Sequence, residues 1–450
     1  MGTWVSRIGR RACSICSASH PEIIRTTYAI SPARSASMTI IEIIPDIITD
    51  IWYIRRCGRA SVDAMDRFTG SVALPLSRCG TRPPRQATWR PTEWRKLTMS
   101  DYEDRPTFPV PNRRYPKKIA LEEAVSTSVF NATATVPVVK TGSELTYTSR
   151  QYNGDVERRL TDLKLRVQSM DEAGVAQTVV SLTMPGIEGV FDADTAVDVA
   201  RRVNDEIHEV YVAGEHADRF RAFACVPLQR PKAAAAEAIR AVQELGAVGV
   251  LVNGYSNVGD AKSIQYLDEP QCEPFWAAVE ELDVPVYLHP RIPASNQLRS
   301  YRGLEFLSGS PWGFGAETAT HALRLMVSGL FDRHPHLKII LGHCGEGLPF
   351  SLPRIDARLR HFQPELIPAA KTLQTYWERN FWVTTAGVFS ENTLADTLRS
   401  CGSDRVLFSV DYPYENYQEI GAWLDGLELD AWTRAKVGWE NAAKLLKLPA

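Results

Sequence analysis

The sequence predicts an α/β protein, a (β/α)8 TIM-type barrel that carries an N-terminal extension, and three observations lead to this prediction. From Lys117 onward, short runs rich in Val and Ile alternate with longer amphipathic stretches, as expected when helices cover buried parallel strands. We find eight such runs, which is the number of strands in this barrel. Four of the runs end in acidic or histidine side chains.

The predicted elements follow one another in strand and helix alternation. We expect strands at residues 119–123, 178–182, 220–227, 248–253, 284–289, 338–343, 381–385 and 406–411. We expect helices at 157–173, 193–215, 232–245, 273–282, 317–330, 391–400 and 432–446. Asp192 and Ser390 stand where helix N-caps are needed. An open Rossmann-type sheet is the competing fold, but no G-x-G-x-x-G motif follows the first strand.

Residues 124–155 are rich in Thr, Ser and Val, and we expect an inserted loop over the barrel mouth. Upstream, residues 1–98 contain 15 basic side chains, 14 of them Arg, against 7 acidic ones. Composition becomes ordinary from Met99. We therefore expect an Arg-rich extension at 1–98 that is disordered or an artefact of gene prediction, a linker at 99–116, and the barrel at 117–450.

Composition excludes several classes of protein. The net charge of -2 gives no excess of positive charge for binding nucleic acid. The apolar stretch 39–54 contains Glu42, Asp46 and Asp50, so it does not predict a membrane span. The eight Cys residues form no secreted disulfide framework. We expect a cytoplasmic protein, or a mitochondrial one if the Arg- and Ser-rich N-terminus acts as a transit peptide.

Four side chains stand at predicted carboxyl ends of strands: Glu122, His289, His343 and Asp411, on the first, fifth, sixth and eighth strands. In this barrel the carboxyl ends of the strands form the active site. Two carboxylates and imidazole nitrogens suit a divalent cation such as zinc, manganese or magnesium. A lone strand-end His is more often structural, but four such groups at the same end favour a metal site.

The body of the chain resembles the amidohydrolase superfamily, in particular its aromatic acid decarboxylases, such as γ-resorcylate and 2,3-dihydroxybenzoate decarboxylases. The resemblance is carried by Lys118-Ile-Ala-Leu-Glu-Glu-Ala124, Asp283-Val-Pro-Val-Tyr-Leu-His-Pro-Arg291, His321-Ala-Leu-Arg-Leu-Met326, Gly329-Leu-Phe-Asp332, Ile340-Leu-Gly-His-Cys-Gly-Glu-Gly-Leu-Pro349 and Leu407-Phe-Ser-Val-Asp-Tyr-Pro413. It covers nearly all of residues 117–448.

The resemblance implies roles for individual residues and for the assembly. Glu122, His289 and Asp411 match metal ligands, His343 and Glu346 match an active-site pair, and Arg354 matches an active-site arginine. The protein is expected to form a homo-oligomer. One position departs from the superfamily pattern, because the usual first-strand H-x-H is here Glu122-x-Ala124. This change favours one divalent ion rather than two.

Decarboxylation of an aromatic acid requires a proton before carbon dioxide leaves, since direct loss would create an unstabilised ring carbanion. A hydroxyl group ortho to the carboxylate can push electron density toward the carbon that accepts the proton. We assign proton delivery to Asp411, directly or with His343, which Glu346 orients. Trp312, with Phe314, is expected to stack on the substrate ring. Arg354 is expected to bind substrate, its alternative being a helix-surface ion pair with Asp356.

The sequence thus predicts a metal-dependent, non-oxidative decarboxylase of an ortho-hydroxybenzoate-type acid, with a small aromatic acid as partner rather than nucleic acid or membrane. The alternative is a metal-dependent hydrolase of a lactone or amide, which would need an activated water and a leaving group. A barrel without catalysis is the third possibility. The presence of Glu122, His289, His343 and Asp411 argues against it.

Overall fold

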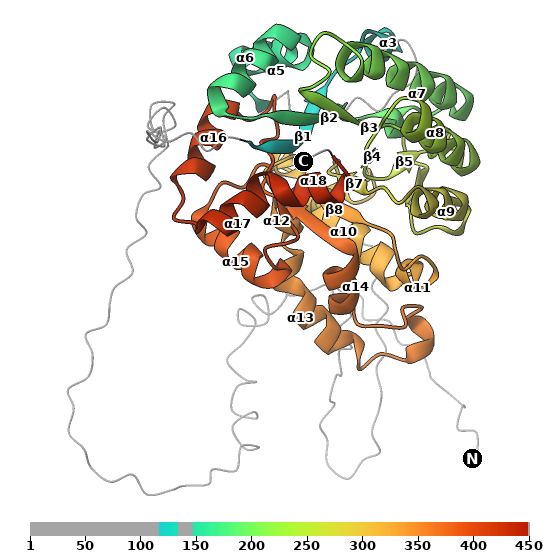
Figure 1. Ribbon diagram of the computed structural model, residues 1–450. Helices are drawn as coiled ribbons and strands as arrows, with labels where there is room; N and C mark the ends of the chain where they lie inside the picture. The colour runs from blue at the N-terminus through green and yellow to red at the C-terminus, as the bar shows by residue number, and fades with distance from the viewer. Residues whose placement is uncertain (1–116, 134–146, 449–450) are drawn as a thin grey trace, which may run out of the picture. The chain divides into compact units, whose positions relative to one another are not determined.

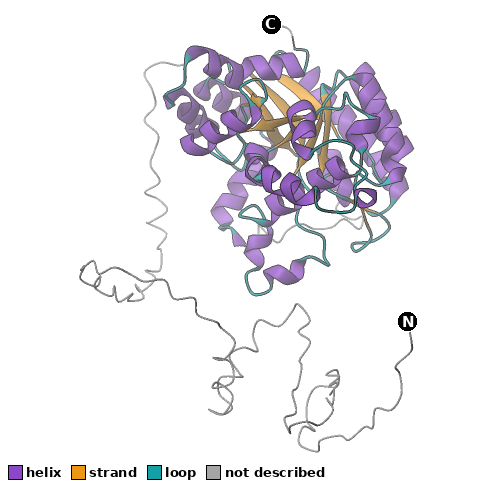
Figure 2. Cartoon of the chain, turned by 90° about the horizontal axis from the view of Figure 1, so that it is seen from below, coloured by secondary structure: helices purple, strands orange, loops and turns teal. Residues whose placement is uncertain are grey.

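The computed structural model describes residues 117–133 and 147–448. Its main sheet has eight strands, and every neighbouring pair is parallel. In order these are β1 (Ile119–Val125), β2 (Gln177–Leu182), β3 (Phe220–Ala224), β4 (Gly249–Asn253), β7 (Val286–His289), β8 (Ile339–Leu341), β9 (Phe381–Thr384) and β10 (Val406–Leu407). Helices surround these central strands (Figures 1 and 2). The predicted (β/α)8 barrel and its eight strands are confirmed.

The barrel closes between its last and first strands through side chains. The Glu123 carboxylate accepts hydrogen bonds from the amides of Val410 (3.0 Å) and Tyr412 (3.2 Å). One backbone bond, from Ala124 N to Tyr412 O (2.8 Å), completes the junction. Because side chains satisfy these amides, β10 ends at Leu407, earlier than the predicted residue 411. Glu123 thus faces away from Glu122, as adjacent strand residues do.

A bulge in β1 turns Glu122 inward. The register between β1 and β2 shifts between Ala120 and Glu123. At this point the Ser409 hydroxyl oxygen accepts hydrogen bonds from two consecutive amides, Leu121 N (3.2 Å) and Glu122 N (2.6 Å). Leu121 packs in the barrel interior, and Glu122 also contacts an interior side chain, Tyr287. The extra residue of a bulge lets two successive side chains face the same side.

Most predicted helices are present, but several are divided. Those found near the expected bounds are α8 (Pro231–Glu244), α9 (Glu273–Leu282), α10 (Gly313–Val327) and α15 (Glu391–Cys401), whereas α7 (Ala193–Ile207) ends well before the predicted residue 215. The predicted helix 157–173 is two helices, α5 (Arg150–Thr161) and α6 (Leu163–Ala173). Asp162 causes the break, because its backbone is extended and its carboxylate caps α6 at Leu165 N (2.9 Å).

π-helical turns interrupt two other predicted helices. The turn η3 (His208–Val212) follows α7. The predicted helix 432–446 comprises α17 (Ala431–Ala435), the π-helical turn η8 (Lys436–Glu440) and α18 (Asn441–Leu445). The predicted caps are confirmed, since Asp192 accepts from Thr195 N (2.8 Å) and Ser390 from Thr393 N (3.3 Å).

Several elements were not predicted. They are α3 (Ser128–Ala132), α11 (Leu330–Arg333), α12 (His343–Glu346), α13 (Leu348–Leu359), α14 (Leu373–Asn380), α16 (Tyr417–Gly426), the hairpin β5 (Ser256–Asn257) with β6 (Ile264–Gln265), and the 3-10 turns η2 (Ile187–Gly189), η4 (Pro270–Cys272), η5 (Leu298–Tyr301), η6 (Glu305–Ser308) and η7 (Pro364–Leu366). The loop prediction for 124–155 is wrong where α3 and α5 lie. Its middle, 134–146, lies outside the described residues.

The core has two layers. Inside the barrel, strand side chains form one cluster, to which the strands contribute Ile119, Leu121, Val179, Phe223, Leu251, Tyr287, Ile340 and Leu407. A larger cluster fills the space between the strands and the helices. Within the described ranges no helix is long and apolar enough to cross a bilayer, and Cys225, Cys272, Cys344 and Cys401 are free thiols. The predicted extension and linker, 1–116, with Cys13, Cys16, Cys57 and Cys79, lie outside them.

Candidate active site

The four predicted strand-end groups come together at one end of the barrel. Glu122 Oε1 lies 3.4 Å from His289 Nε2 and 4.0 Å from His343 Nε2. His343 Nε2 in turn lies 3.9 Å from Asp411 Oδ2. The Glu122 side chain is 3% exposed, whereas those of His289, His343 and Asp411 are 16 to 24% exposed. Glu122 therefore forms the floor of the site, and the other three are open to a small ligand.

A strained turn after β8 holds His343 against Glu346. All five residues from His343 to Gly347 have positive φ angles, between 53° and 84°. Such left-handed backbone costs about 1–2 kcal/mol for each residue that is not glycine. The turn brings His343 Nδ1 to 2.8 Å from Glu346 Oε1, and the Glu346 side chain is 4% exposed. The predicted pair is thus formed, and the backbone strain lies at the site itself.

The second strained position is Asp411, with φ 74°, in the segment that follows β10. Burial raises the pKa of Asp411 to about 8, a shift increased by the Glu122 carboxylate and opposed by His343. Burial alone would lower the pKa of His343, but the carboxylates of Glu346, Glu122 and Asp411 raise it well above its ordinary value. The Glu122 carboxylate thus contributes to raising the pKa of both Asp411 and His343.

Because Gly342 and Gly387 have no side chain, the Glu122, His343 and Asp411 side chains can lie directly against their backbone. A Cβ atom at Gly342 would lie 2.7 Å from Glu122 Oε2. A Cβ atom at Gly387, after β9, would lie 2.7 Å from His343 Cδ2 and 3.6 Å from Asp411 Oδ2. Any larger side chain at these positions would displace the site groups.

The side chains present fit a divalent cation. Glu122 Oε1 is buried and has no hydrogen-bond partner. Two ligands that share one ion at about 2.1 Å stand roughly 3.0–3.4 Å apart, and Glu122 Oε1 and His289 Nε2 are 3.4 Å apart. Burial lowers the pKa of His289, which keeps its imidazole neutral as a ligand must be. The described residues hold no group of three acidic, His or Cys side chains already closed around one point.

The two predicted substrate-binding residues, Trp312 and Arg354, are both exposed. Trp312 precedes α10 and is 66% exposed, but its helix begins beside Glu346, since a Cβ at Gly315 would lie 2.8 Å from Glu346 Oε2. Arg354 is exposed on α13 and makes no ion pair among the described residues. The alternative ion pair with Asp356 is wrong, because that carboxylate binds the first amides of α14.

Sequence reasoning missed the polar side chains that support the cluster. Tyr287 donates a hydrogen bond to Glu122 Oε2, and Thr384 Oγ1 lies 2.9 Å from the Tyr287 hydroxyl. Tyr287 stands two residues before His289 on the same strand, so strand alternation could have found it. Thr384 and Ser409 carried no such signal, because short hydroxyl side chains are common at strand ends.

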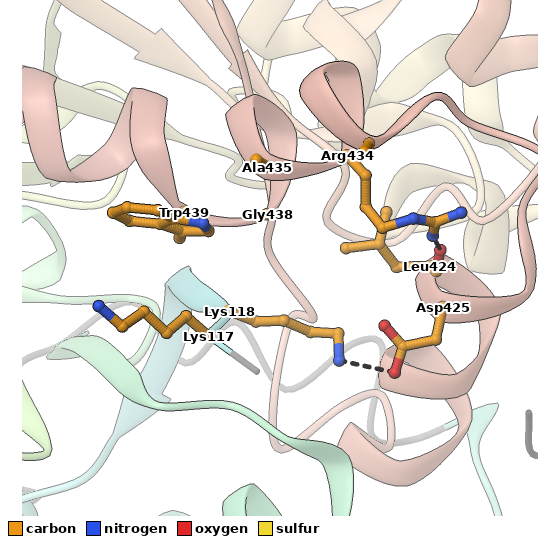
Figure 3. Close-up of a pocket in the computed structure, with 9 residues that line it drawn as sticks. Lys117, Lys118, Leu424, Asp425, Arg434, Ala435, Gly438 and Trp439 are labelled. Atoms are coloured by element: carbon orange, nitrogen blue, oxygen red, sulfur yellow. Dashed lines mark hydrogen bonds and ion pairs between the residues drawn. The ribbon is translucent and has the colours of Figure 1, made fainter. Parts of the chain in front are cut away.

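A cavity of about 110 Å³ lies at the opposite end of β1 (Figure 3). Lys118 Nζ and Asp425 Oδ2 form a buried ion pair there at 2.9 Å, and Lys117 lies 4.9 Å from the centre of the Trp439 ring. These residues stand at the amino-terminal end of the strand, whereas barrel enzymes react at the carboxyl ends. This cavity is therefore not the candidate active site.

Comparison with known proteins agrees with this geometry. The amidohydrolase family matches residues 103–448. A γ-resorcylate decarboxylase of Rhodococcus jostii (strain RHA1) is 44% identical over 338 residues, covering 74% of this chain and 98% of the relative. A crystal structure of 2,6-dihydroxybenzoate decarboxylase with 2,6-dihydroxybenzoate superimposes with a TM-score of 0.69 at 42% identity, covering 74% of this chain and 100% of that one.

A second solved structure is informative about the metal. The dihydroxybenzoic acid decarboxylase of Polaromonas sp. JS666, with bound manganese and the inhibitor 2-nitroresorcinol, superimposes with a TM-score of 0.69 at 42% identity, covering 74% of this chain and 98% of that one. By its family match, its sequence identity to these relatives and its fold, this chain belongs to the aromatic acid decarboxylase branch of the amidohydrolase family.

Proposed function

We propose that this protein is a metal-dependent carboxy-lyase that removes carbon dioxide from an ortho-hydroxybenzoate without an oxidant. The observation that carries the proposal is that Glu122, His289, His343 and Asp411 meet at the carboxyl ends of the strands. Glu122 lies 3.4 Å from His289 and 4.0 Å from His343, and His343 lies 3.9 Å from Asp411. The decarboxylase relatives make 2,6-dihydroxybenzoate the first substrate to test. No observation favours the lactone or amide hydrolase.

Glu122, His289 and Asp411 would hold one divalent ion. When bound, this ion acts as a Lewis acid that binds substrate oxygens and stabilises negative charge near the ring. Manganese is our first candidate because related structures carry it, with zinc and magnesium as the alternatives.

The proton comes from the pair formed by Asp411 and His343. Glu346 fixes the His343 ring through Nδ1, which leaves Nε2 directed toward Asp411 Oδ2 and the open side of the site. The proton passes to the carboxyl-bearing carbon of the ring, the carbon–carbon bond to the carboxylate breaks, and aromaticity returns as carbon dioxide leaves. Solvent then restores the consumed proton.

Two residues are proposed to bind the substrate, Trp312 by stacking on its ring and Arg354 by charge. Arg354 is exposed in the single chain, so we propose that it binds substrate in the site of a second copy of the protein that packs against α13.

Phe350, Phe362 and Leu366, which lie on or just after α13, are 55 to 65% exposed. We propose that this apolar surface is buried in a homo-oligomer. Phe350→Glu should lower the mass measured by light scattering, and an unchanged mass would refute this interface.

The test of the function is carbon dioxide release from a panel of ortho-hydroxybenzoates by a chain that starts at Met99, with and without a chelator. We expect Mn²⁺-dependent release that falls at least 1,000-fold in Asp411→Asn, roughly the loss expected on removing a proton donor together with a ligand. Release that survives the chelator would refute metal dependence. No release from any member of the panel by metal-loaded protein would refute the decarboxylase proposal.

The cellular location is a separate proposal. We propose the cytoplasm, in keeping with the buried free thiols of Cys225, Cys272 and Cys344. Fractionation that places the protein in mitochondria would instead support a transit function for the N-terminal residues.

A further inference from the structure

The two oxygens of the Glu122 carboxylate have different environments. Oε2 accepts a hydrogen bond from the Tyr287 hydroxyl and lies 3.4 Å from Thr384 Oγ1. Oε1 faces His289 Nε2 at 3.4 Å and has no hydrogen-bond partner, although it is buried. A buried carboxylate oxygen without a donor costs free energy, which a cation at that position would recover.

The single proton of the Tyr287 hydroxyl fixes the direction of its hydrogen bond to Glu122. A tyrosine hydroxyl has one proton, and a carboxylate only accepts, so Tyr287 donates to Glu122 Oε2. Thr384 Oγ1 lies 2.9 Å from the Tyr287 oxygen and 3.4 Å from the Ala386 amide nitrogen. The Thr384 hydroxyl, which accepts from the Ala386 N–H, has two acceptors within reach, the Tyr287 oxygen and Glu122 Oε2, so it supports the carboxylate through Tyr287 and directly. Connected hydrogen bonds of this kind polarise one another.

Rigid elements hold both donors. Tyr287 lies in the middle of β7, is 0% exposed, and packs against Phe223 with ring centres 5.9 Å apart. Thr384 ends β9 and is also 0% exposed. Glu122 itself stands at the β1 bulge, whose amide binds the Ser409 hydroxyl. The carboxylate is thus held by donors on two strands, β7 and β9, while the β1 bulge and Ser409 fix the Glu122 backbone.

We propose that Tyr287 and Thr384 are positioning residues that fix Glu122, so that this carboxylate binds the divalent ion through Oε1 alone; this rests on the proposed metal-dependent function. Because Ala124 cannot supply a second metal ligand from the first strand, the affinity for the divalent ion depends more strongly on the orientation of the Glu122 carboxylate. Hydrogen-bond partners of metal ligands commonly contribute 10- to 100-fold in affinity or activity.

The test measures Mn²⁺ affinity by competition with a chelator, without substrate. Tyr287→Phe should weaken Mn²⁺ binding roughly 10- to 100-fold, because the Oε2 donor is lost and the carboxylate can rotate. Thr384→Val, which removes the longer bond to Oε2 and the partner of the Tyr287 hydroxyl but keeps Tyr287 itself, should weaken Mn²⁺ binding by a smaller factor. The matched control is Tyr376→Phe, since the buried Tyr376 hydroxyl donates to Asp332 Oδ2 (2.5 Å) on α11, a carboxylate outside the cluster.

The outcomes separate this proposal from the proposed function. Unchanged Mn²⁺ affinity in folded Tyr287→Phe, or an equal loss in Tyr376→Phe, would overturn the positioning role, as would a wild-type protein that binds no Mn²⁺. If Tyr287→Phe fails to fold by circular dichroism, Thr384→Val decides, and unchanged affinity there overturns the proposal. A protein that binds Mn²⁺ more weakly in both variants but releases no carbon dioxide would support the positioning role and refute only the decarboxylase.

Discussion

Individual side chains in this barrel mouth are arranged by burial and by their immediate partners. Glu346 is 96% buried and contacts one ring nitrogen of His343, which leaves the other nitrogen free to face Asp411. We propose that Glu346 orients that imidazole and supports its charge.

Glu346→Gln should lower kcat roughly 10- to 100-fold with little change in KM, because the amide keeps the shape but loses the charge that supports His343. Steady-state kinetics on the best substrate of the panel would measure this. A change confined to KM would show instead that Glu346 acts in substrate binding.

A second buried carboxyl lies at the carboxyl ends of neighbouring strands. Glu188 is 0% exposed, and burial raises its pKa to about 7, opposed by Arg291 and by a hydrogen bond from Asn253. Since the folded state keeps the proton that the unfolded chain loses near pH 4.5, this group makes stability fall as pH rises from about 4.5 through 7.

Glu188→Gln should therefore be more stable than the parent protein at pH 8, by up to about 3 kcal/mol, and nearly equal to it at pH 5. Glu123, whose pKa burial also raises to about 7, contributes the same trend in both proteins and cancels in the difference. Urea unfolding at the two pH values gives the comparison. A difference that does not depend on pH would contradict the assignment.

At the scale of elements, the turn from His343 to Gly347 brings the His343 and Glu346 side chains together, and its glycines Gly345 and Gly347 differ in their surroundings. Gly347 (φ 72°) has open space where a Cβ would stand, whereas a Cβ at Gly345 (φ 84°) would lie 2.8 Å from Trp377 Cη2. Gly347 is favoured only because its φ angle is positive. Gly345 is favoured for the same reason and also because a side chain would collide with Trp377.

We expect Gly347→Ala to cost about 1 kcal/mol of stability from backbone strain. Gly345→Ala should cost about 2–5 kcal/mol, because overpacking against Trp377 adds to the strain. It should also lower kcat by moving His343. Denaturant unfolding and kinetics of both variants test this, and equal destabilisation by the two would contradict it.

At the scale of the whole molecule, the site is built from distant parts of the chain. Glu122 and Asp411 are 289 positions apart, and only barrel closure, through Glu123 and Ser409, brings their strands together. A ligand that links β1, β7 and the segment after β10 should therefore stabilise the closed barrel as a unit.

Mn²⁺ at 100 times its dissociation constant should add about 2.7 kcal/mol to the free energy of unfolding. The melting temperature of a chain that starts at Met99 should rise by a few degrees. Thermal melts with Mn²⁺, with Ca²⁺ and with a chelator would measure it. Equal shifts by Mn²⁺ and Ca²⁺ would point to unspecific ion binding rather than to the Glu122 and His289 site.

The sequence by itself determined the barrel, its eight strands and the four strand-end residues of the site, because strand and helix periodicities and the position of a residue in its strand are local properties. It also identified the His343 and Glu346 pair, but only through the family resemblance. The tertiary structure decided what depends on contacts between distant segments: the bulge that turns Glu122 inward, the closure by Ser409 and Glu123, and the support from Tyr287 and Thr384. Hydrogen bonds between residues far apart in the chain produce these features, and no local pattern records them.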